Sequence, residues 1–378
     1  MEVLARERAA LEALLPGFDS VLGGMSLADL EDRDGNAIEL FRETGGTGLL
    51  VPRDHRGLGA TALEAIRVQR AIGSRAPSLA IATTMHHFSA ATLVELWRRD
   101  KGLEWMLLQA IAQKRVLLAS GFAEGVRGQG VLHPTMRGRR VNGKVLISGS
   151  KKPCSLARSM DILTASVVVS SDDGAPDEFG VALISANLPG VHVEPFWRAP
   201  VLTGAQSEAV GLRDVAIEDD LVVKLGSAED PELDEIQRAG FVWFELLITA
   251  SYLGMASALV ERAIAQERGD SSSRVALAAE VEATMGSLEA VARQVDDEGA
   301  ADADLLAQAL LARYAAQDAI TRTVASAVEL LGGMAFIGGE EVSYLAAASR
   351  ALGFHPPARP KTAAALAESL TGGELVIG

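Results

Sequence analysis

The sequence predicts an α+β protein with an N-terminal α-helical domain, a central antiparallel β-barrel or sandwich, and a C-terminal four-helix bundle. Apolar residues follow a helical spacing up to about residue 115 and return to it after residue 230. Between these parts lie short runs rich in Val, Ile and Leu, separated by turn residues. Because 378 residues exceed one ordinary core, we expect three domains, at 1–115, 116–229 and 230–378.

The first domain is expected to consist of helices joined by one long loop. Leu4, Leu11 and Leu15 form an apolar stripe at helical spacing, and residues 78–97 indicate a long, mostly buried helix. Residues 48–60 contain Pro52 and several glycines, which break a helix. This segment is therefore expected to be a loop.

The central domain is expected to be a mainly antiparallel sheet. Asn142 and Gly143 stand between two short runs, and this dipeptide is a strong signal for a type I′ hairpin turn. No helix-length stretch separates the strands, which favours antiparallel connections over parallel crossovers. The expected strands lie at 116–122, 145–148, 162–169, 180–185 and 191–194.

The C-terminal part is expected to be a bundle of long antiparallel helices. Residues 241–260 are long and apolar enough to cross a membrane, with Glu245 as their single charge. No basic cluster flanks them, and a helix that is apolar all round also occurs at the centre of large soluble α-domains. We therefore expect no membrane span. The expected helices lie at 234–268, 275–297, 303–331, 340–352 and 362–370.

Composition excludes several classes of protein. The chain has 35 Lys and Arg against 50 Asp and Glu, a net charge of -15, whereas a general nucleic-acid binder needs a cationic surface. A single cysteine, Cys154, excludes an internal disulfide, and the six histidines show no metal-ligand spacing, so no metal is expected. The first residues lack a basic segment followed by an apolar one, so we expect a cytoplasmic protein.

One stretch of the acidic chain is strongly basic. Residues 125–160 contain no Asp or Glu, and we call them the cationic island. Such an island is able to offset the phosphates of a dinucleotide or of phosphopantetheine. The alternative is that these side chains are solvated ends of strands and hairpins. The cations are Arg127, Arg137, Arg139, Arg140, Lys144, Lys151, Lys152 and Arg158.

Five short motifs follow one another along nearly the whole chain. They are GLLVP with GLG at 48–52 and 57–59, GFAE at 121–124, NG with GSKKPCS at 142–143 and 149–155, QSEAVGLRDVAIEDDLVV at 206–223, and LLGG at 330–333. Each motif is weak alone. Together, in this order and near this spacing, they resemble the acyl-CoA dehydrogenase superfamily of flavoproteins.

The resemblance implies FAD as the cofactor and a homo-oligomer, either a dimer or a tetramer. A hetero-oligomer with a paralogue is the alternative. The superfamily binds FAD through an RxxFG motif. Residues 267–274, which occupy its place here, keep arginines but lack the Phe-Gly pair. The FAD contacts implied by the resemblance are Phe122, Ala123 and Glu124 at the pyrimidine side, Cys154 and Ser155 at the N5 edge, Arg268 or Arg274 in place of the missing motif, and Gly332 and Gly333 at a neighbouring subunit's pyrophosphate.

The superfamily's usual catalytic base is missing. Members commonly place a glutamate in a YEGT segment, but residues 353–360 contain no carboxylate. A minority place it on the first bundle helix, close to Glu245, whose apolar neighbours would raise its pKa toward neutrality. The alternative is that Glu245 stabilises the first turns of its helix. His355 is a second candidate to act as base or to polarise the substrate. His86, His87 and Arg127 are assigned to substrate binding, with a core role for both histidines as the alternative.

The resemblance predicts FAD-dependent oxidation of an acyl thioester, carried on CoA or a carrier protein, to the 2,3-enoyl product. Glu245 would remove the α-proton while the β-hydride passes to flavin N5. The electron acceptor would be an electron-transfer flavoprotein or O₂. Two alternatives use the same fold: a flavin-dependent monooxygenase that consumes reduced flavin and O₂, and a non-catalytic partner subunit.

Overall fold

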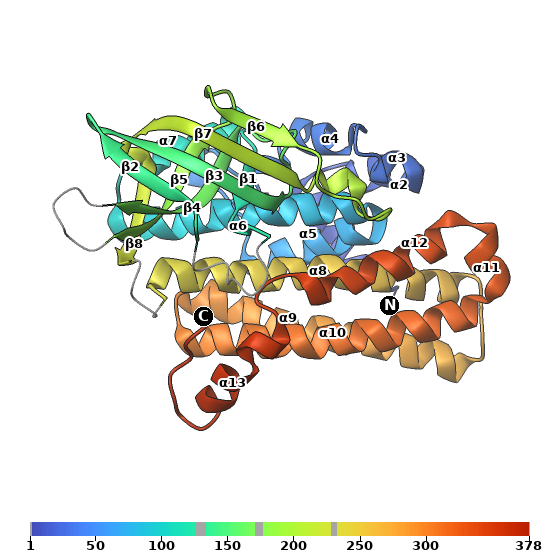
Figure 1. The fold of residues 1–378 in the computed structure, drawn as a ribbon. Helices are drawn as coiled ribbons and strands as arrows, with labels where there is room; N and C mark the ends of the chain where they lie inside the picture. Colours follow the sequence, from blue (N-terminus) through green and yellow to red (C-terminus); the bar gives the residue numbers. More distant parts are fainter. Residues whose placement is uncertain (1, 126–133, 171–176, 228–232, 378) are drawn as a thin grey trace.

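The computed structural model describes residues 2–125, 134–170, 177–227 and 233–377. Figure 1 shows a sheet lying over a layer of N-terminal helices, with the C-terminal helices beneath them. The chain changes from helix to strand between α7 (Glu104–Gln113) and β1 (Leu118–Gly121), and back to helix between β8 (Val222–Ser227) and α8 (Glu235–Ala265). The predicted order of helices, strands and helices is therefore confirmed.

The N-terminal part contains two long helices, α5 and α6. α5 begins after Thr61, whose hydroxyl and the Glu64 carboxylate satisfy each other's backbone N–H groups in a capping box. The helix predicted at 78–97 is confirmed as α6, and 3₁₀ turns occupy part of the expected loop at 48–60. The helices are α1 Ala5–Leu14, α2 Phe18–Gly23, α3 Leu27–Glu31, α4 Ala37–Glu43, α5 Ala62–Arg75, α6 Pro77–Asp100 and α7 Glu104–Gln113.

The central part is one eight-stranded sheet with the order β6-β7-β3-β2-β4-β5-β8, in which β1 pairs with β4. The hairpin at Asn142 and Gly143 is confirmed, because both have positive φ and the flanking Val141 pairs with Lys144. The pairings are antiparallel except where β1 and β2 run parallel to β4. The strands are β1 Leu118–Gly121, β2 Arg137–Val141, β3 Lys144–Cys154, β4 Ile162–Ser170, β5 Glu178–Ser185, β6 Val191–Glu194, β7 Glu208–Glu218 and β8 Val222–Ser227.

The C-terminal part is built around α8, which packs against α9 and α10 on one side and against α5 and α6 on the other. Among the described helices, α8 alone is long and apolar enough to cross a membrane, and its apolar window lies entirely inside the protein. Helices from both ends of the chain therefore share one apolar core. The elements are α8 Glu235–Ala265, α9 Ser271–Glu298, α10 Ala303–Leu331, α11 Gly333–Gly338, α12 Glu340–Ala348 and α13 Arg359–Ser369.

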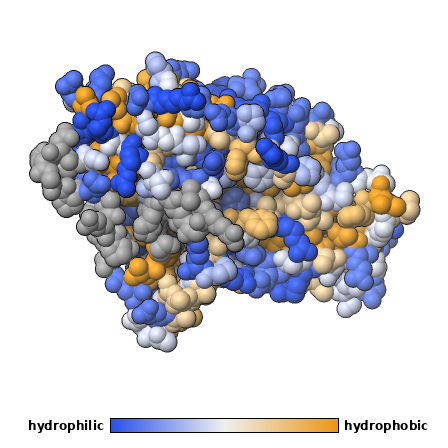
Figure 2. Space-filling view, viewed as in Figure 1, coloured by the Kyte–Doolittle hydropathy of each residue, from blue (hydrophilic) through white to orange (hydrophobic). Residues whose placement is uncertain are grey.

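Apolar side chains are exposed at one end of the bundle. Met334 and Ile337 on α11 are 77% and 75% exposed, and Phe336 between them is 43% exposed. In Figure 2, orange side chains gather at the right-hand end of the molecule, where α11 lies in Figure 1. Exposed apolar patches of this kind mark contact surfaces in soluble proteins.

Candidate functional site

Four rings from four parts of the chain form a continuous row, which we call the aromatic row. Phe122 follows β1, and its ring centroid lies 6.1 Å from that of Phe88 on α6. Phe88 lies 5.4 Å from Phe244 on α8, and Phe244 lies 6.1 Å from the His355 ring. The row thus joins the segment predicted to line a flavin to the C-terminal loop where the superfamily usually carries its base.

A pair of hydroxyl groups lies where β3 ends and β7 begins. The Ser155 hydroxyl lies 2.9 Å from that of Ser207, and both residues are buried. Cys154, the preceding residue, is fully buried, and burial raises the pKa of its thiol to about 12. Cys154 therefore remains a thiol at neutral pH and is not available as a nucleophile.

Glu124 directs its carboxylate into the β-domain. Its Oε1 atom lies 2.7 Å from Nζ of Lys151, and the Thr135 backbone N–H also donates to it. Burial alone would raise the pKa of Glu124, but the hydrogen bonds from Lys151 and Thr135 outweigh it and hold the pKa at about 2. The Ala123 carbonyl accepts from the Lys152 N–H, which fixes the chain before Gly125.

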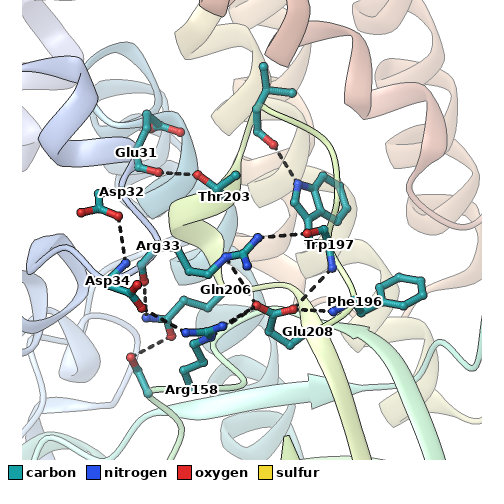
Figure 3. Close-up of polar contacts among 12 residues, drawn as sticks. Glu31, Asp32, Arg33, Asp34, Arg158, Phe196, Trp197, Thr203, Gln206 and Glu208 are labelled. Atoms are coloured by element: carbon teal, nitrogen blue, oxygen red, sulfur yellow. Dashed lines mark hydrogen bonds and ion pairs between the residues drawn. The ribbon is translucent and has the colours of Figure 1, made fainter. Parts of the chain in front are cut away.

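A second carboxylate, Glu208 at the start of β7, binds two arginines and the backbone at Phe196 (Figure 3). Arg33 and Arg158 approach its Oε1 atom to 3.5 and 3.2 Å, and the Phe196 N–H donates to Oε2 at 2.7 Å. Burial alone would raise the pKa of Glu208, but these backbone and guanidinium partners lower it overall. Glu208 therefore stays ionised and ties the loop after α3 to the start of β7.

His86 and His87 lie in the helical core. His86 bridges two backbones, with Nε2 2.8 Å from the Thr47 carbonyl and Nδ1 accepting from the Leu118 N–H. Burial lowers the pKa of His86 to about 4 and holds the pKa of His87 well below its usual range, so both are neutral. His87 packs edge-on against Phe41 rather than in the aromatic row. This geometry favours the core alternative for His86, whereas neither ring nitrogen of the buried His87 has a hydrogen-bond partner among the described residues.

Glu245 lies in a buried ion pair. Its carboxylate oxygens are 3.0 and 2.8 Å from Nη1 of Arg313 on α10, and both side chains are essentially inaccessible. Burial raises the pKa of Glu245 to about 7, and the Arg313 charge opposes that rise. α8 begins at Glu235 rather than near Gly240, so Glu245 is not in its first turns. The macrodipole alternative therefore loses its geometric basis.

His355 lies in the loop between the 3₁₀ turn Ser349–Phe354 and α13. Its Nε2 atom is 2.9 Å from the Tyr252 hydroxyl on α8. Burial and the nearby Arg313 charge lower the pKa of His355 to about 3, so the imidazole is neutral. A neutral imidazole offers one N–H donor and one acceptor but no charge.

The remaining predicted cofactor residues meet at the far end of the bundle. Arg268 and Arg274 lie in the α8–α9 connection, where Arg274 donates to the Gly269 carbonyl at 2.7 Å. Gly332 and Gly333 join α10 to α11 in open space. Glu245 and the end of α8 are 20 residues apart, about 30 Å at 1.5 Å per residue. The structure therefore separates these four residues from the aromatic row within one chain.

The cationic island is largely neutralised. Arg137, Arg140, Lys144, Lys151 and Arg158 each pair with at least one carboxylate, and all of these carboxylates come from outside the island. Among the described residues, Arg139 and Lys152 have no ion partner. Arg127 lies outside the described residues. The island therefore leaves little free positive charge for phosphates.

A cavity of about 710 Å³ lies between α3, residues 200–203 and α12. Four carboxylates line it, those of Asp29, Glu31, Asp32 and Glu340, together with the Tyr344 phenol. No residue of the aromatic row lines it. An acidic lining disfavours anionic ligands such as phosphates.

Known proteins resemble this chain over its full length. No family model matches the chain. An isobutylamine N-hydroxylase from Streptomyces viridifaciens is 44% identical over 381 residues, covering 100% of both chains. The chain belongs to the acyl-CoA dehydrogenase superfamily of flavoenzymes. It is accordingly an oxidoreductase with a flavin cofactor, as the sequence predicted.

Solved structures of this superfamily share the fold. The nitrososynthase from Micromonospora carbonacea var. africana superposes with a TM-score of 0.81 at 18% identity, covering 98% of this chain and 96% of that one. TdsC from Paenibacillus sp. A11-2, with FMN and indole, gives 0.81 at 18% identity and covers 99% of both. The acyl-CoA dehydrogenase fold predicted from the motifs is confirmed.

The residues around the hydroxyl pair fit a flavin ring. Ser155 and Ser207 share one hydrogen bond, so one of their two hydroxyl protons is left to donate. Phe122 and Ala123 are half-buried, the Ala123 carbonyl accepts from the N–H of Lys152, three residues before Ser155, and the Phe122 ring packs near that of Phe88. Flat apolar side chains with one hydroxyl donor suit a planar ring that has a polar edge. Ser155, Ser207, Phe122 and Ala123 would hold the ring.

Sequence reasoning missed several residues of this site. Ser207 and Glu208 were seen only as part of a motif, and Phe88, Tyr252 and Arg313 were not singled out. Arg313 carried a usable signal, because it is a lone cation within an apolar stretch of α10. Glu245 is the matching lone charge of the apolar run 241–260 within α8, and opposite charges in two buried helices indicate a pair.

Proposed function

We propose that this flavoenzyme is a monooxygenase that hydroxylates the nitrogen of a primary amine. The observation that carries the proposal is the full-length relative, an amine N-hydroxylase at 44% identity. This supports the monooxygenase alternative over acyl-thioester dehydrogenation. The relatives give no support to an acyl-CoA substrate or to an electron-transfer flavoprotein. In the proposed reaction, O₂ is both the electron acceptor and the source of the inserted oxygen atom.

The charges of the site support the same choice. Dehydrogenation needs a carboxylate that removes an α-proton, and residues 353–360 supply only the neutral His355. The Glu245 carboxylate is directed at Arg313 instead. N-hydroxylation needs no carboxylate base, because the amine nitrogen supplies its own electron pair.

The proposed reaction balances with reduced flavin and O₂. When bound and reduced, the flavin supplies two electrons and activates O₂. One oxygen atom forms the new N–O bond in place of an N–H hydrogen, and the other leaves as water after gaining two protons. The products are a hydroxylamine and water.

The chain's own residues would bind and orient the amine. The rings of Phe88, Phe122 and Phe244 contact its alkyl part and exclude water from the reacting nitrogen. A site with a neutral histidine and no free carboxylate favours the uncharged amine over the ammonium ion, and only the uncharged form has a free electron pair. His355 donates one hydrogen bond to the oxygen atom that leaves as water.

Turnover with labelled oxygen tests the proposal. The purified chain is supplied with a flavin reductase, NADH, isotopically labelled O₂ and isobutylamine, with FAD and FMN in parallel because the resemblance implies FAD and TdsC holds FMN. We expect mass spectrometry to show one labelled oxygen atom in the hydroxylamine product. An unlabelled product, or anaerobic conversion of acyl-CoA to enoyl-CoA with an artificial acceptor, would overturn the proposal.

We further propose that the chain acts as a homo-oligomer through the exposed face of α11. Met334, Phe336 and Ile337 lie beside Gly332 and Gly333, the residues that the resemblance assigns to a neighbouring subunit's cofactor. Light scattering should give a multiple of 39.6 kDa. Met334→Glu with Ile337→Glu should lower that mass and weaken flavin binding together.

A further inference from the structure

Arg313 binds the loop that carries His355 through four backbone carbonyls. Its Nη2 donates to the carbonyls of His355 at 2.6 Å and Leu352 at 3.2 Å. Its Nη1 reaches the carbonyls of Pro356 and Pro357 at 3.4 Å, while also contacting Glu245. One guanidinium therefore ties the whole turn from residue 352 to residue 357 to α10.

Glu245 compensates the positive charge of Arg313, which would otherwise be buried without a counter-charge. A guanidinium with only neutral carbonyl partners would leave an uncompensated charge in the protein interior, which is strongly destabilising. The carboxylate at 2.8 Å supplies the counter-charge without using the Nη2 donors. Arg313 is thus free to hold two carbonyls with Nη2, including that of His355.

The side chain of His355 is fixed from a different helix. Tyr252 on α8 holds Nε2, while Arg313 on α10 holds the backbone of the same residue. Two restraints from two helices define both the position of the loop and the orientation of the ring. Among the described residues no partner holds Nδ1, which is the atom left for a reacting molecule.

We propose that Glu245 and Arg313 are a positioning pair, which holds the His355 imidazole at the end of the aromatic row where the substrate reacts. The inference rests on the proposed function for the site's chemistry, but the geometry it describes belongs to the chain alone. Neither residue touches the substrate. Their role is to position His355, which does contact the substrate.

Enzyme assays with matched variants test the pair. Glu245→Gln keeps the shape of the carboxylate and removes its charge, and Arg313→Lys keeps the charge and removes the fork of donors. We expect kcat and the yield of hydroxylamine per O₂ to fall on the order of 10- to 100-fold, with hydrogen peroxide rising and KM little changed. The control is Glu7→Gln, because Glu7 forms an equally buried ion pair with Arg70 elsewhere in the fold. It should lower stability without changing the yield.

A double-mutant cycle separates positioning from general destabilisation. If Arg313 acts through His355, Arg313→Lys should have little further effect on the yield in a His355→Ala background. Equal effects with and without His355 would overturn the proposal, because they would show that Arg313 acts independently of the imidazole.

Measurements on the flavin-free protein keep this test independent of the proposed function. In ¹⁵N NMR spectra, the His355 ring should populate a single neutral tautomer, and Glu245→Gln should produce a mixture of both. Amide hydrogen exchange at residues 352–357 should rise in Glu245→Gln and Arg313→Lys but not in Glu7→Gln. Unchanged tautomer and exchange would overturn the positioning pair, whereas changes without any hydroxylamine would overturn only the proposed function.

Discussion

The Tyr252 hydroxyl lies 2.9 Å from Nε2 of His355, so a fully buried side chain of α8 reaches the imidazole of the C-terminal loop. Burial raises the pKa of Tyr252 above its usual range, which keeps the phenol protonated and able to donate. We therefore assign Nε2 as the acceptor and place the imidazole proton on Nδ1. The contact with Tyr252 therefore leaves the protonated Nδ1 of His355 as the nitrogen that is available to the substrate.

Tyr252→Phe should disturb the tautomer of His355 without emptying the core. A neutral hydrogen bond contributes about 0.5–1.5 kcal/mol, so we expect hydroxylamine formation to fall roughly 2- to 10-fold. The loss should appear in kcat rather than in KM. Tyr344→Phe is the control, because that phenol contacts Glu31 and the Leu202 N–H instead of His355. Similar losses in the two variants would contradict the assigned tautomer.

Ser155→Ala should weaken flavin binding, because it removes one of the two hydroxyls that share a single hydrogen bond at the end of β3. Loss of one donor of this kind corresponds to roughly a 2- to 10-fold rise in the flavin Kd. Flavin fluorescence titration measures it. Ser148→Ala, within β3, removes a hydroxyl that bonds to the exposed Asp214, and it should leave the Kd unchanged.

Glu208→Gln should loosen the segment before Ser207. The change removes the charge that Arg33 and Arg158 share, and both guanidiniums are partly exposed, so water offsets some of the loss. We expect the free energy of unfolding to fall by about 1–3 kcal/mol. Glu218→Gln breaks an exposed pair with Lys144 and should cost less than about 1 kcal/mol. Urea denaturation that ranks the two variants in the opposite order would contradict this.

The fold was predictable because its signals are local. The helix expected at 303–331 is observed at the same bounds as α10, and Asn142 with Gly143 sets the hairpin expected there. These patterns depend on neighbours in the sequence and on solvent exposure. The motifs, although weak one by one, also identified the superfamily.

The site was less predictable because its contacts join distant positions. Glu245 and Arg313 are 68 positions apart on different helices, and only the packing of α8 against α10 brings them together. The ion pairs of the cationic island were not predictable from the sequence for the same reason. The island's acidic partners come from strands that are distant in sequence. Glu218 lies on β7, which pairs with β3, and Glu178 lies on β5, which β4 separates from β2 in the sheet.

Glu31 should make the stability of the protein depend on pH near neutrality. Its carboxylate lies between α3, α6 and α12, where it accepts from the Ser78 N–H and from the Ser78 and Tyr344 hydroxyls. Burial raises the pKa of Glu31 to about 7, against an ordinary 4.5, although these hydrogen bonds oppose the rise. The folded chain therefore keeps this proton to a higher pH than the unfolded chain does.

The sign of the effect follows from that difference. The contribution of Glu31 is fully present below pH 4.5 and is lost as the pH rises through 7. The wild type should lose about 1–3 kcal/mol more of its unfolding free energy between pH 5 and pH 8 than Glu31→Gln does. Subtracting the two urea-denaturation profiles cancels other titrating groups, including Glu245. Glu39→Gln, which alters an exposed carboxylate, should follow the wild type, and parallel wild-type and Glu31→Gln profiles would show that Glu31 titrates normally.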